Sequence, residues 1–481
     1  MNQLSSTPRV DAEEADMHSL LQAQQKAFLA DMNPSYDTRM ERLRRLQDMT
    51  ERHGPALVEA ISQDFGHRSA HETRLIDLMI ATAAIKHVRN KLKAWMRPRR
   101  VATALHFRPG RSLVLRQPLG VVGIIAPWNY PYQVSIGPAV GAIAAGNRVM
   151  IKPSELTPRF SELLRHIVTE SFAEDEVSVV TGDVDVGRTF AGLPFDHLLF
   201  TGSTAVGKLV AQVAARNLTP VTLELGGKSP VIIDSSCDLD IAAPRLTHAK
   251  LLNAGQTCIA PDYALVPADR VPAFVAALKR TAAQLYPTYG RNPDYTSIIS
   301  ERHYARLAGL VEDARVHGAQ IIPLNSSGEV ADPDSRKMIP AIVLGVTQEM
   351  RIMREEIFGP LLPVMTYDTL DNAIAHINRN DRPLALYWFG NDRKHRDRVL
   401  AGTISGGVTI NDCLWHAAQD DMPFGGVGAS GMGAYHGESG FRTFSKEKPV
   451  FFQPRHNGLF LLRPPYGRTF ELAAGLLKAI I

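Results

Sequence analysis

Short apolar runs alternate with longer amphipathic segments from Val121 onward, and this alternation predicts an α/β protein. The runs in the first half are VVGIIAP, RVMIK, VSVV, HLLF, VTLEL and PVIID. They lack strict alternation of apolar and polar positions, which is typical of strands buried on both faces of a sheet. Alanine-rich and amphipathic segments between them favour helical crossovers. The pattern predicts a doubly wound parallel sheet that binds its ligands at the carboxyl ends of the strands.

A second set of such runs begins near Tyr263 and predicts a second α/β domain. It comprises YALVP, AQIIPL, PAIVLGV, LALYWFG and GGVTIN. Residues 107–120, FRPGRSLVLRQPLG, have the pattern of an extended hairpin arm that precedes the first sheet. We therefore expect two α/β domains with a small β arm.

The first 100 residues and the C-terminus have helical patterns. Met40, Leu43, Leu46 and Met49 recur every three residues, and Gly54 offers a stop for this helix. A second apolar stripe ends before Pro98 and consists of Leu75, Leu78, Met79, Ile85, Val88, Leu92 and Trp95. The final ELAAGLLKAII predicts a docked helix, with a membrane-surface anchor as the alternative, and this segment could cover a dimer partner or the substrate entrance.

Composition places the chain among soluble multidomain proteins. Its 481 residues exceed the roughly 250–300 residues at which a single core stops growing. A net charge of +4 with dispersed Lys and Arg does not favour a nucleic-acid partner, and RPRR at 97–100 fits a solvated helix end. The N-terminus lacks the pattern of a signal peptide, and no apolar stretch is long enough to span a membrane. We expect a cytoplasmic protein.

Three scattered cysteines predict neither a disulfide framework nor a metal site. Cys237 and Cys413 fit small core residues. Cys258, in LLNAGQTCIAPDYAL, follows Gly255 and small residues that let the backbone approach a ligand. Its own neighbours leave two readings open, a buried core thiol and a nucleophile.

Two polar residues at strand ends could serve a nucleophile. Glu224 lies in the otherwise apolar VTLEL, where burial would raise its pKa into the range useful for a general base. A buried ion pair is the alternative. Asn129 follows a buried strand and Trp128, and its amide could donate to an oxyanion, although asparagine in a turn commonly serves only the turn.

Two glycine- or proline-containing turns could hold a nucleotide. HLLFTGSTAVGK places Gly202, Ser203, Thr204 and Gly207 between a buried strand and a helix, where free N–H groups attract anions. The pattern is neither GxGxxG nor a Walker loop, and an ordinary helix cap explains it equally well. In MIKPSELTP, Lys152 and Glu155 could bind ribose hydroxyls, or the segment could simply cap the next helix.

These segments occur together and in order, and the chain closely resembles the aldehyde dehydrogenase superfamily over residues 40–450. The matching stretches are PWNYP (127–131), KPSELTP (152–158), FTGSTAVG (200–207), LELGGKSP (223–230), GQTC (255–258), EEIFGP (355–360) and PFGGVGASGMGAYHG (423–437). CIAPDY and GMGAYHG resemble the class 3 branch. PFDHLLFTGSTAV, NPDYTSII and GFRTFSKEKPV resemble bacterial coniferyl aldehyde dehydrogenases.

The resemblance implies a role for each candidate residue. Cys258 would be the nucleophile, Glu224 the general base and Asn129 an oxyanion donor, with no metal needed. The adenosine ribose of the cofactor would be held by Lys152 and Glu155, and the pyrophosphate by the turn of Gly202, Ser203, Thr204, Ala205, Val206 and Gly207. The nicotinamide ribose would be held by Glu356 and Phe358, and the nicotinamide would be approached by Leu225 and Gly226. The wall of the groove would be formed by Ile125, Pro127 and Trp128.

The resemblance also implies the architecture and the partners. The fold would be a Rossmann-like NAD(P)-binding domain (1–106 and 121–225), an α/β catalytic domain (226–433), and an oligomerisation arm with a C-terminal tail (107–120 and 434–481). NAD is the expected cofactor, with NADP possible, and a homodimer is expected. Coniferyl or another aromatic aldehyde is the expected substrate, and Trp415 and His416 could wall its entrance or simply pack a loop. Aliphatic aldehydes, a CoA-acylating reaction and cofactor-free thiol hydrolysis are the alternatives.

Overall fold

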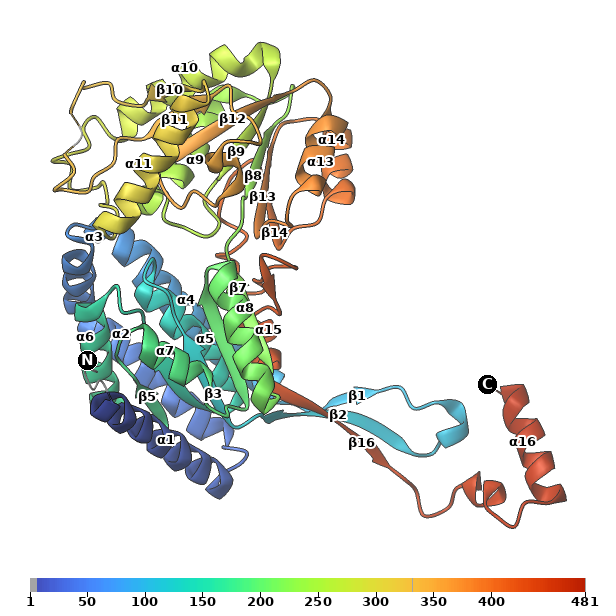
Figure 1. Cartoon of the computed structure of the whole chain (residues 1–481). Coiled ribbons are helices and arrows are strands. Elements are labelled where there is room, and N and C mark those ends of the chain that lie inside the picture. Colours follow the sequence, from blue (N-terminus) through green and yellow to red (C-terminus); the bar gives the residue numbers. More distant parts are fainter. Residues whose placement is uncertain (1–6, 331, 481) are drawn as a thin grey trace, which may run out of the picture.

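The computed structural model describes residues 7–330 and 332–480, which form two lobes and a projecting arm (Figure 1). The first lobe is built on a six-stranded sheet of order β15-β7-β6-β3-β4-β5, parallel except for β15. The strands are β3 Val121–Ile125, β4 Arg148–Lys152, β5 Val177–Val179, β6 His197–Gly202, β7 Val221–Leu225 and β15 Gly431–Met432. The chain leaves β3 in one direction for β4 and β5 and in the other for β6 and β7. This reversal creates a ligand-binding crevice at the carboxyl ends of β3 and β6.

The second lobe is built on a seven-stranded sheet of order β10-β11-β12-β9-β8-β13-β14. The strands are β8 Pro230–Ile233, β9 Tyr263–Pro267, β10 Gln320–Pro323, β11 Ala341–Leu344, β12 Leu361–Tyr367, β13 Ala385–Phe389 and β14 Gly407–Ile410. All neighbours are parallel except β10 and β11. The predicted runs all form strands, but PVIID, grouped above with the first set, is β8 of this sheet. The segment LLPVMTY, which forms β12, was not among the predicted strands.

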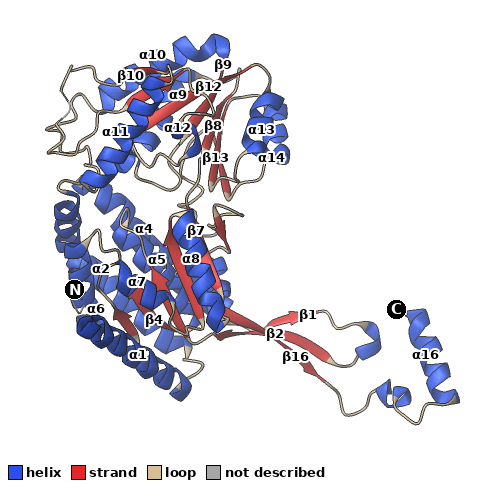
Figure 2. Ribbon diagram, in the orientation of Figure 1, coloured by secondary structure: helices blue, strands red, loops and turns tan. Residues whose placement is uncertain are grey.

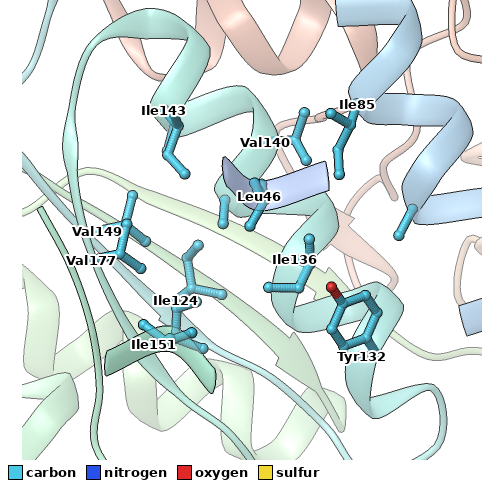
Figure 3. Packing of buried hydrophobic residues seen from close by; sticks show 14 of the residues in the cluster. Leu46, Ile85, Ile124, Tyr132, Ile136, Val140, Ile143, Val149, Ile151 and Val177 are labelled. Atoms are coloured by element: carbon cyan, nitrogen blue, oxygen red, sulfur yellow. The ribbon is translucent and has the colours of Figure 1, made fainter. Parts of the chain in front are cut away.

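Helices cover both faces of the first sheet. The helices α2 Tyr36–Phe65, α4 Ile80–Trp95, α5 Pro131–Ala145 and α6 Pro158–Ser171 pack on one face. Figure 3 shows this core, in which Leu46 of α2 and Ile85 of α4 lie near Ile136 of α5 and Ile124 of β3. The opposite face is covered by α1 Thr7–Ala30, α7 Val184–Ala191 and α8 Thr204–Ala214. Because both faces are covered, the strands read as continuous apolar runs.

The second lobe has the same layered organisation, with helices (blue in Figure 2) on both faces of the sheet. The helices α9 Leu239–Leu251 and α10 Val271–Leu285 pack on one face. The other face is covered by α11 Glu301–Val316, α13 Leu370–Arg379 and α14 Arg393–Gly402. The short helices α3 Ala70–Glu72 and α12 Arg351–Arg354 stand next to the site described below.

The stop predicted at Gly54 is wrong, because α2 continues through Gly54 and Pro55 to Phe65. The apolar periodicity continues past the proline with Leu57 and Ile61, both fully buried. Burial of these side chains outweighs the backbone hydrogen bond that proline removes. The helix ends instead at Gly66, whose φ of 77° only glycine adopts readily.

The apolar stripe predicted over 75–95 is only partly buried. Residues Thr73–Met79 form a π-helical segment, and α4 begins at Ile80. A π turn shifts the angular phase of the residues that follow it, so Leu75 and Met79 are 39% and 61% exposed. The buried stripe consists of Ala81, Ile85, Val88, Leu92 and Trp95.

The arm is a three-stranded antiparallel sheet that projects from the first lobe (Figure 1). Its central strand β2 Arg111–Pro118 pairs with β1 Arg99–Val101 and with β16 Ser445–Phe452. The extended arm expected over 107–120 is therefore present, and its first strand comes from the basic segment predicted as a helix end.

The C-terminal helix α16 Arg468–Ile480 does not dock on either lobe of its own chain. It stands beyond the tip of the arm (Figure 1). Leu472 and Leu476 are 71% and 68% exposed. None of the described helices is both long and apolar enough to cross a membrane.

Candidate functional site

A cleft of about 250 Å³ lies where residues of both lobes meet, at the carboxyl ends of β3, β6 and β7. Ten of the predicted site residues line it: Pro127, Trp128, Asn129, Gly202, Ser203, Glu224, Gly226, Cys258, Glu356 and Phe358. These residues come from positions as far apart as 127 and 358 in the chain. The fold thus brings the candidate thiol, carboxylates and amide into one cavity.

Asn129 lies in the turn that joins β3 to α5 and is almost fully buried. Its carbonyl oxygen accepts hydrogen bonds from Arg68 Nη1 at 2.8 Å and from Asn253 Nδ2 at 3.1 Å. Its side-chain Nδ2 donates to the carbonyl oxygen of Gln256 at 3.1 Å, two residues before Cys258. The amide is therefore held beside the thiol by bonds at both its backbone and its side chain.

The backbone just before Cys258 adopts a strained left-handed turn. Asn253 and Ala254 have φ values of 52° and 51°, and Gly255 has 76°. A Cβ on Gly255 would lie 2.3 Å from the carbonyl oxygen of Gly359, so only glycine fits there. Each left-handed non-glycine residue costs about 1–3 kcal/mol, so the surroundings must hold this turn in place.

A buried polar network holds the turn. Both carboxylate oxygens of Glu72 accept from the N–H of Asn253 at 3.1 Å, and Thr296 donates to the same carboxylate at 2.7 Å. The side chain of Gln256 donates to the carbonyl oxygens of Asn253 and Ser297, both at 3.0 Å. Because these groups are buried and mutually satisfied, they fix the path of the chain into Cys258.

Cys258 is partly exposed, and its side chain lines the cleft. Burial, together with the nearby carboxylates of Glu356 and Glu224, raises the pKa of its thiol to about 12. The N–H groups of Cys258 and Ile259 oppose this shift. The thiol is therefore protonated near neutral pH, and a base must take its proton before it can attack an electrophile.

Glu224 is the fourth residue of β7 and is 2% exposed. Neither of its carboxylate oxygens has a hydrogen-bond partner within the described structure, and no described cation pairs with it. Burial raises its pKa well above 4.5. The buried ion pair that the sequence left open is thus absent from the described residues, and an unpartnered carboxylate faces the cleft instead.

Glu356 and Phe358 lie in the loop between α12 and β12 and line the cleft. Glu356 Oε1 accepts from the N–H of Gly227 at 3.1 Å, and burial raises the pKa of Glu356 to about 8. A Cβ on Gly226 would lie 2.1 Å from Glu356 Oε2, so the glycine allows this close approach. The ring of Phe358 packs edge-on against Trp128 with 5.4 Å between ring centroids.

The glycine-containing turn after β6 is both a helix cap and part of the cleft. The Ser203 hydroxyl caps α8 by accepting from the N–H of Val206 at 3.4 Å. Thr204 and Ala205 form the first turn of this helix together with Val206. A Cβ on Gly207 would lie 2.5 Å from Leu225 Cδ2, so the helix packs closely on β7.

Ile125 ends β3, the strand that leads into the cleft, whereas Lys152 ends the neighbouring strand β4 and Glu155 lies in the loop after it. Ile125 pairs in register with Lys152, so both stand at the carboxyl ends of neighbouring strands. Lys152 Nζ donates to the carbonyl oxygen of Pro153 at 2.9 Å and lies 4.0 Å from Glu155 Oε2. The Glu155 side chain is 39% exposed, so its carboxylate is accessible at the edge of the crevice, whereas the Lys152 side chain is 3% exposed.

Sequence reasoning missed several residues of the site. Tyr130, Val134, Thr201, His303 and Arg306 also line the cleft. His303 and Arg306 are three residues apart on α11, a spacing that many exposed helices show, so no sequence signal distinguished them.

The loop residues proposed as a substrate wall do not line the cleft. Trp415 is 46% exposed, while His416 is buried with its Nδ1 2.8 Å from the Thr409 hydroxyl.

Comparisons with known proteins agree on one family. The model of the aldehyde dehydrogenase family matches residues 3–450. The chain is 51% identical to a probable coniferyl aldehyde dehydrogenase of Pseudomonas aeruginosa, covering 95% of this chain and 94% of that protein. It is 46% identical to the coniferyl aldehyde dehydrogenase of Pseudomonas sp. strain HR199, covering 96% of each.

Solved structures show the same likeness. The substrate-bound state of Staphylococcus aureus AldH matches with a TM-score of 0.91 and 38% identity, over 96% of this chain and 99% of that one. An NAD-dependent aldehyde dehydrogenase from Sinorhizobium meliloti matches with a TM-score of 0.84 and 28% identity, over 94% and 89% of the two chains. An E. coli NADP-dependent enzyme matches with a TM-score of 0.83 and 25% identity, over 92% and 91%.

Proposed function

The chain belongs to the aldehyde dehydrogenase family, and we propose that it oxidises coniferyl aldehyde or a related aromatic aldehyde to the carboxylic acid with NAD. The observation that carries the mechanism is the convergence of a thiol, an amide donor and an unpartnered carboxylate in one cleft. The aromatic substrate is inferred from the coniferyl aldehyde dehydrogenases that the chain resembles at 46–51% identity.

Enzymes of this family use NAD or NADP, and the residues of the cleft fit such a cofactor. Gly226 leaves open backbone beside Glu356, where a Cβ would collide with the carboxylate. When bound, the nicotinamide would accept the hydride. We propose that four groups of residues hold the dinucleotide. Glu356, Phe358, Leu225 and Gly226 would contact its nicotinamide end, and Lys152 and Glu155 its adenosine ribose. The pyrophosphate would lie on the turn formed by Gly202, Ser203, Thr204, Ala205, Val206 and Gly207, and the groove wall would be formed by Ile125, Pro127 and Trp128.

The first step assigned to this chain is covalent attack on the aldehyde. The Cys258 thiol gives its proton to solvent water and its sulfur bonds to the carbonyl carbon, which places a negative charge on the carbonyl oxygen. The Asn129 amide has two N–H donors, and its described hydrogen bond to Gln256 leaves the second for this oxygen. The N–H of Cys258 is the second proposed donor, so the charge is stabilised by groups that are already in place.

Loss of a hydride from the thiohemiacetal carbon, which a bound nicotinamide would accept, leaves a thioester on Cys258. The second step is hydrolysis of this thioester. Glu224 takes a proton from water, the oxygen attacks the thioester carbon, and the bond to Cys258 sulfur breaks. A carboxyl group with a raised pKa suits this task, because it accepts a proton readily near neutral pH. The products are the carboxylic acid and the regenerated thiol.

Replacing Asn129 with alanine is expected to lower kcat about 10²–10³-fold, because loss of one oxyanion donor has this effect. The KM for the aldehyde should change far less, since the donor acts on charge that develops during reaction. Steady-state kinetics with NAD measures both constants. Asn147, whose buried amide bonds to Ala142 and Phe444 outside the cleft, offers a matched control. An Asn129→Ala enzyme with parental kcat would remove the amide from the mechanism.

The substrate is tested by following NADH absorbance with coniferyl aldehyde, benzaldehyde and C4–C14 aliphatic aldehydes. We expect the highest kcat/KM for coniferyl aldehyde or another cinnamyl aldehyde. A kcat/KM that rises with aliphatic chain length and exceeds the aromatic values would instead assign a medium- or long-chain aldehyde.

Glu155 is expected to favour NAD over NADP, because its carboxylate would repel a 2′-phosphate on the adenosine ribose. The variant Glu155→Gln should raise kcat/KM for NADP relative to NAD about tenfold, which corresponds to about 1.4 kcal/mol of relieved repulsion. The exposed Asp185, paired with Arg188 on α7, supplies the control Asp185→Asn. An unchanged NAD/NADP ratio in Glu155→Gln would place the ribose elsewhere.

We also propose that the chain divides into a cofactor-binding unit, a catalytic unit and an arm with a C-terminal tail, with β1 in the arm and β15 in the cofactor-binding sheet, and that it forms a homodimer through the arm and tail. The support is a set of exposed apolar side chains on this part of the chain: Phe107, Phe451, Phe452, Phe460, Leu472 and Leu476. The double substitution Leu472→Glu and Leu476→Glu should convert a dimer into a monomer in sedimentation velocity. Leu218→Glu, at a leucine of the first lobe that is 88% exposed, should not. A monomeric parent protein would refute the dimer.

A further inference from the structure

The loop that carries Glu356 is anchored on both sides of this residue by a buried ion pair. Asp262 Oδ1 accepts from the N–H of Ile357 at 2.8 Å, directly after Glu356. Lys228 Nζ donates to the carbonyl oxygen of Glu355 at 3.0 Å, directly before it, and to that of Ile352 at 2.8 Å. The two anchoring side chains also form an ion pair with each other.

The Lys228 and Asp262 side chains form their hydrogen bonds with the loop and with each other. The Lys228 ammonium has three protons, and they go to Asp262 and to the two carbonyl oxygens of the loop. Asp262 is 3% exposed, so its charge requires such partners. The buried Lys250 also lies nearby and donates to the carbonyl oxygen of Pro261 at 2.8 Å.

A further contact holds the peptide of Glu356 itself. Arg306 on α11 donates to the carbonyl oxygen of Glu356 at 3.2 Å and to that of Ile357. The backbone on each side of the Glu356 side chain is thus fixed. The Glu356 carboxylate then meets the N–H of Gly227, which is the residue adjacent to Lys228.

The same pair connects this loop to the nucleophile. Asp262 follows Cys258 by four residues, at the entry to β9, and its N–H donates to the carbonyl oxygen of Ser229 at 2.8 Å. A displacement of the Glu356 loop would therefore have to break bonds to the segment that also carries the thiol. Asp262, the aspartate of CIAPDY, thus connects the Glu356 loop with the segment that carries Cys258.

We propose that Asp262 and Lys228 are positioning residues that set the place of Glu356 and thereby the orientation of the bound cofactor. The inference rests on the proposed function, in which Glu356 binds the nicotinamide ribose. Neither side chain lines the cleft, so they act through Glu356 and do not touch the reacting atoms. Loss of the pair should weaken cofactor binding and hydride transfer while leaving the thiol and the aldehyde site in place.

Two substitutions separate the functions of the pair. Asp262→Asn retains an oxygen for the N–H of Ile357 but turns an N–H donor toward the Lys228 ammonium. Lys228→Met keeps the aliphatic stem and removes the bonds to Glu355 and Ile352. In each we expect kcat/KM for NAD to fall roughly tenfold to a hundredfold, because small misplacements of positioning groups have effects of this size. The double variant should lose less than the product of the single losses, since the two residues act as one unit.

The experiment measures kcat, KM for NAD, KM for the aldehyde, NADH affinity by fluorescence, and the rate of Cys258 alkylation by iodoacetamide. Asp234→Asn is the matched control: Asp234 is also buried and bonded to a cation-forming side chain, His395, but lies outside the cleft. Thermal unfolding temperatures of all variants are recorded. We expect the control to lose stability comparably while its NAD constants stay at the parental values.

Glu356→Gln is the reference variant, because it tests the role of Glu356 separately from the role of Asp262 and Lys228. If it leaves the NAD constants unchanged, the proposed role of Glu356 is wrong. If it weakens NAD binding while Asp262→Asn and Lys228→Met do not, the positioning inference is wrong and the proposed function stands. Equal losses for NAD, aldehyde and alkylation in the two positioning variants would also overturn the inference, because that outcome indicates general unfolding of the site.

Discussion

Replacing Cys258 with alanine is expected to abolish aldehyde oxidation, with a loss in kcat of about 10⁴-fold or more because the proposed covalent nucleophile is removed. The fold should survive, since the side chain is small, partly exposed and at the surface of a cleft. Acid production by chromatography and NADH formation by absorbance measure the loss. Unfolding temperature verifies the fold.

Cys237→Ala is the matched control for this substitution. Cys237 is a free thiol that is 6% exposed and packs in the hydrophobic core of the second lobe. Its replacement should leave kcat unchanged and lower stability modestly through a small cavity. An alanine variant at 258 that oxidises aldehydes at the parental rate would mean that another group forms the bond to the substrate.

Replacing Glu224 with glutamine is expected to stall the reaction after hydride transfer and lower kcat by about 10²–10⁴-fold, the usual contribution of a general base. Glutamine has nearly the same shape but cannot accept the proton of water. Rapid mixing with aldehyde and NAD should therefore show one rapid equivalent of NADH per active site and little thereafter. A variant with parental steady-state turnover would show that another group activates the water.

The pH dependence of the parent enzyme should report the same carboxyl group. Burial raises the pKa of Glu224 well above 4.5, and the residue works as a base only after losing its proton. The rate of thioester hydrolysis should therefore rise with pH over a range above that of an ordinary carboxyl group. Stopped-flow turnover across a pH series checks this. An acid limb at the ordinary carboxyl pKa would contradict the burial of the base.

Stability should change with pH in the opposite direction. The folded state holds the Glu224 proton more tightly than the unfolded state does, so the free energy of unfolding falls as pH rises above about 4.5 toward the folded pKa. Glu224→Gln lacks this loss and should become more stable than the parent by a margin that grows over this range. Unfolding temperatures of both proteins at several pH values measure the margin.

The layered fold could be predicted from the sequence because both of its sheets are covered by helices. Strands buried on both faces read as continuous apolar runs, and nearly all of them were found. The family and the fold that the motifs implied are confirmed by the comparisons. Errors arose where burial overrode a local signal: α2 continues past Gly54 and Pro55 because Leu57 and Ile61 lie in the core.

The position of the C-terminal helix could not be predicted from the sequence for a different reason. Its apolar pattern predicted docking, yet Leu472 and Leu476 remain exposed within a single chain. Periodicity reports that a helix has an apolar face but does not identify what covers it.

The candidate site was predictable where a residue is chemically unusual in its own segment. Glu224 in an apolar strand and Asn129 after a strand stand out in the sequence. The residues that hold them do not: Arg68 and Glu72 lie in an ordinary polar stretch, and their role depends on contacts with Asn129 and Asn253 far along the chain. Asp262 likewise shows its function only through the loop that it anchors.

The central claim, a thioester on Cys258 that Glu224 hydrolyses, is tested most directly by mass spectrometry of Glu224→Gln. The variant is mixed with coniferyl aldehyde and NAD, quenched in acid and digested. We predict a mass increase equal to the acyl group, located on the peptide that contains Cys258 and removed by hydroxylamine. Unmodified Cys258 accompanied by one equivalent of NADH, or an acyl group on another residue, would contradict it.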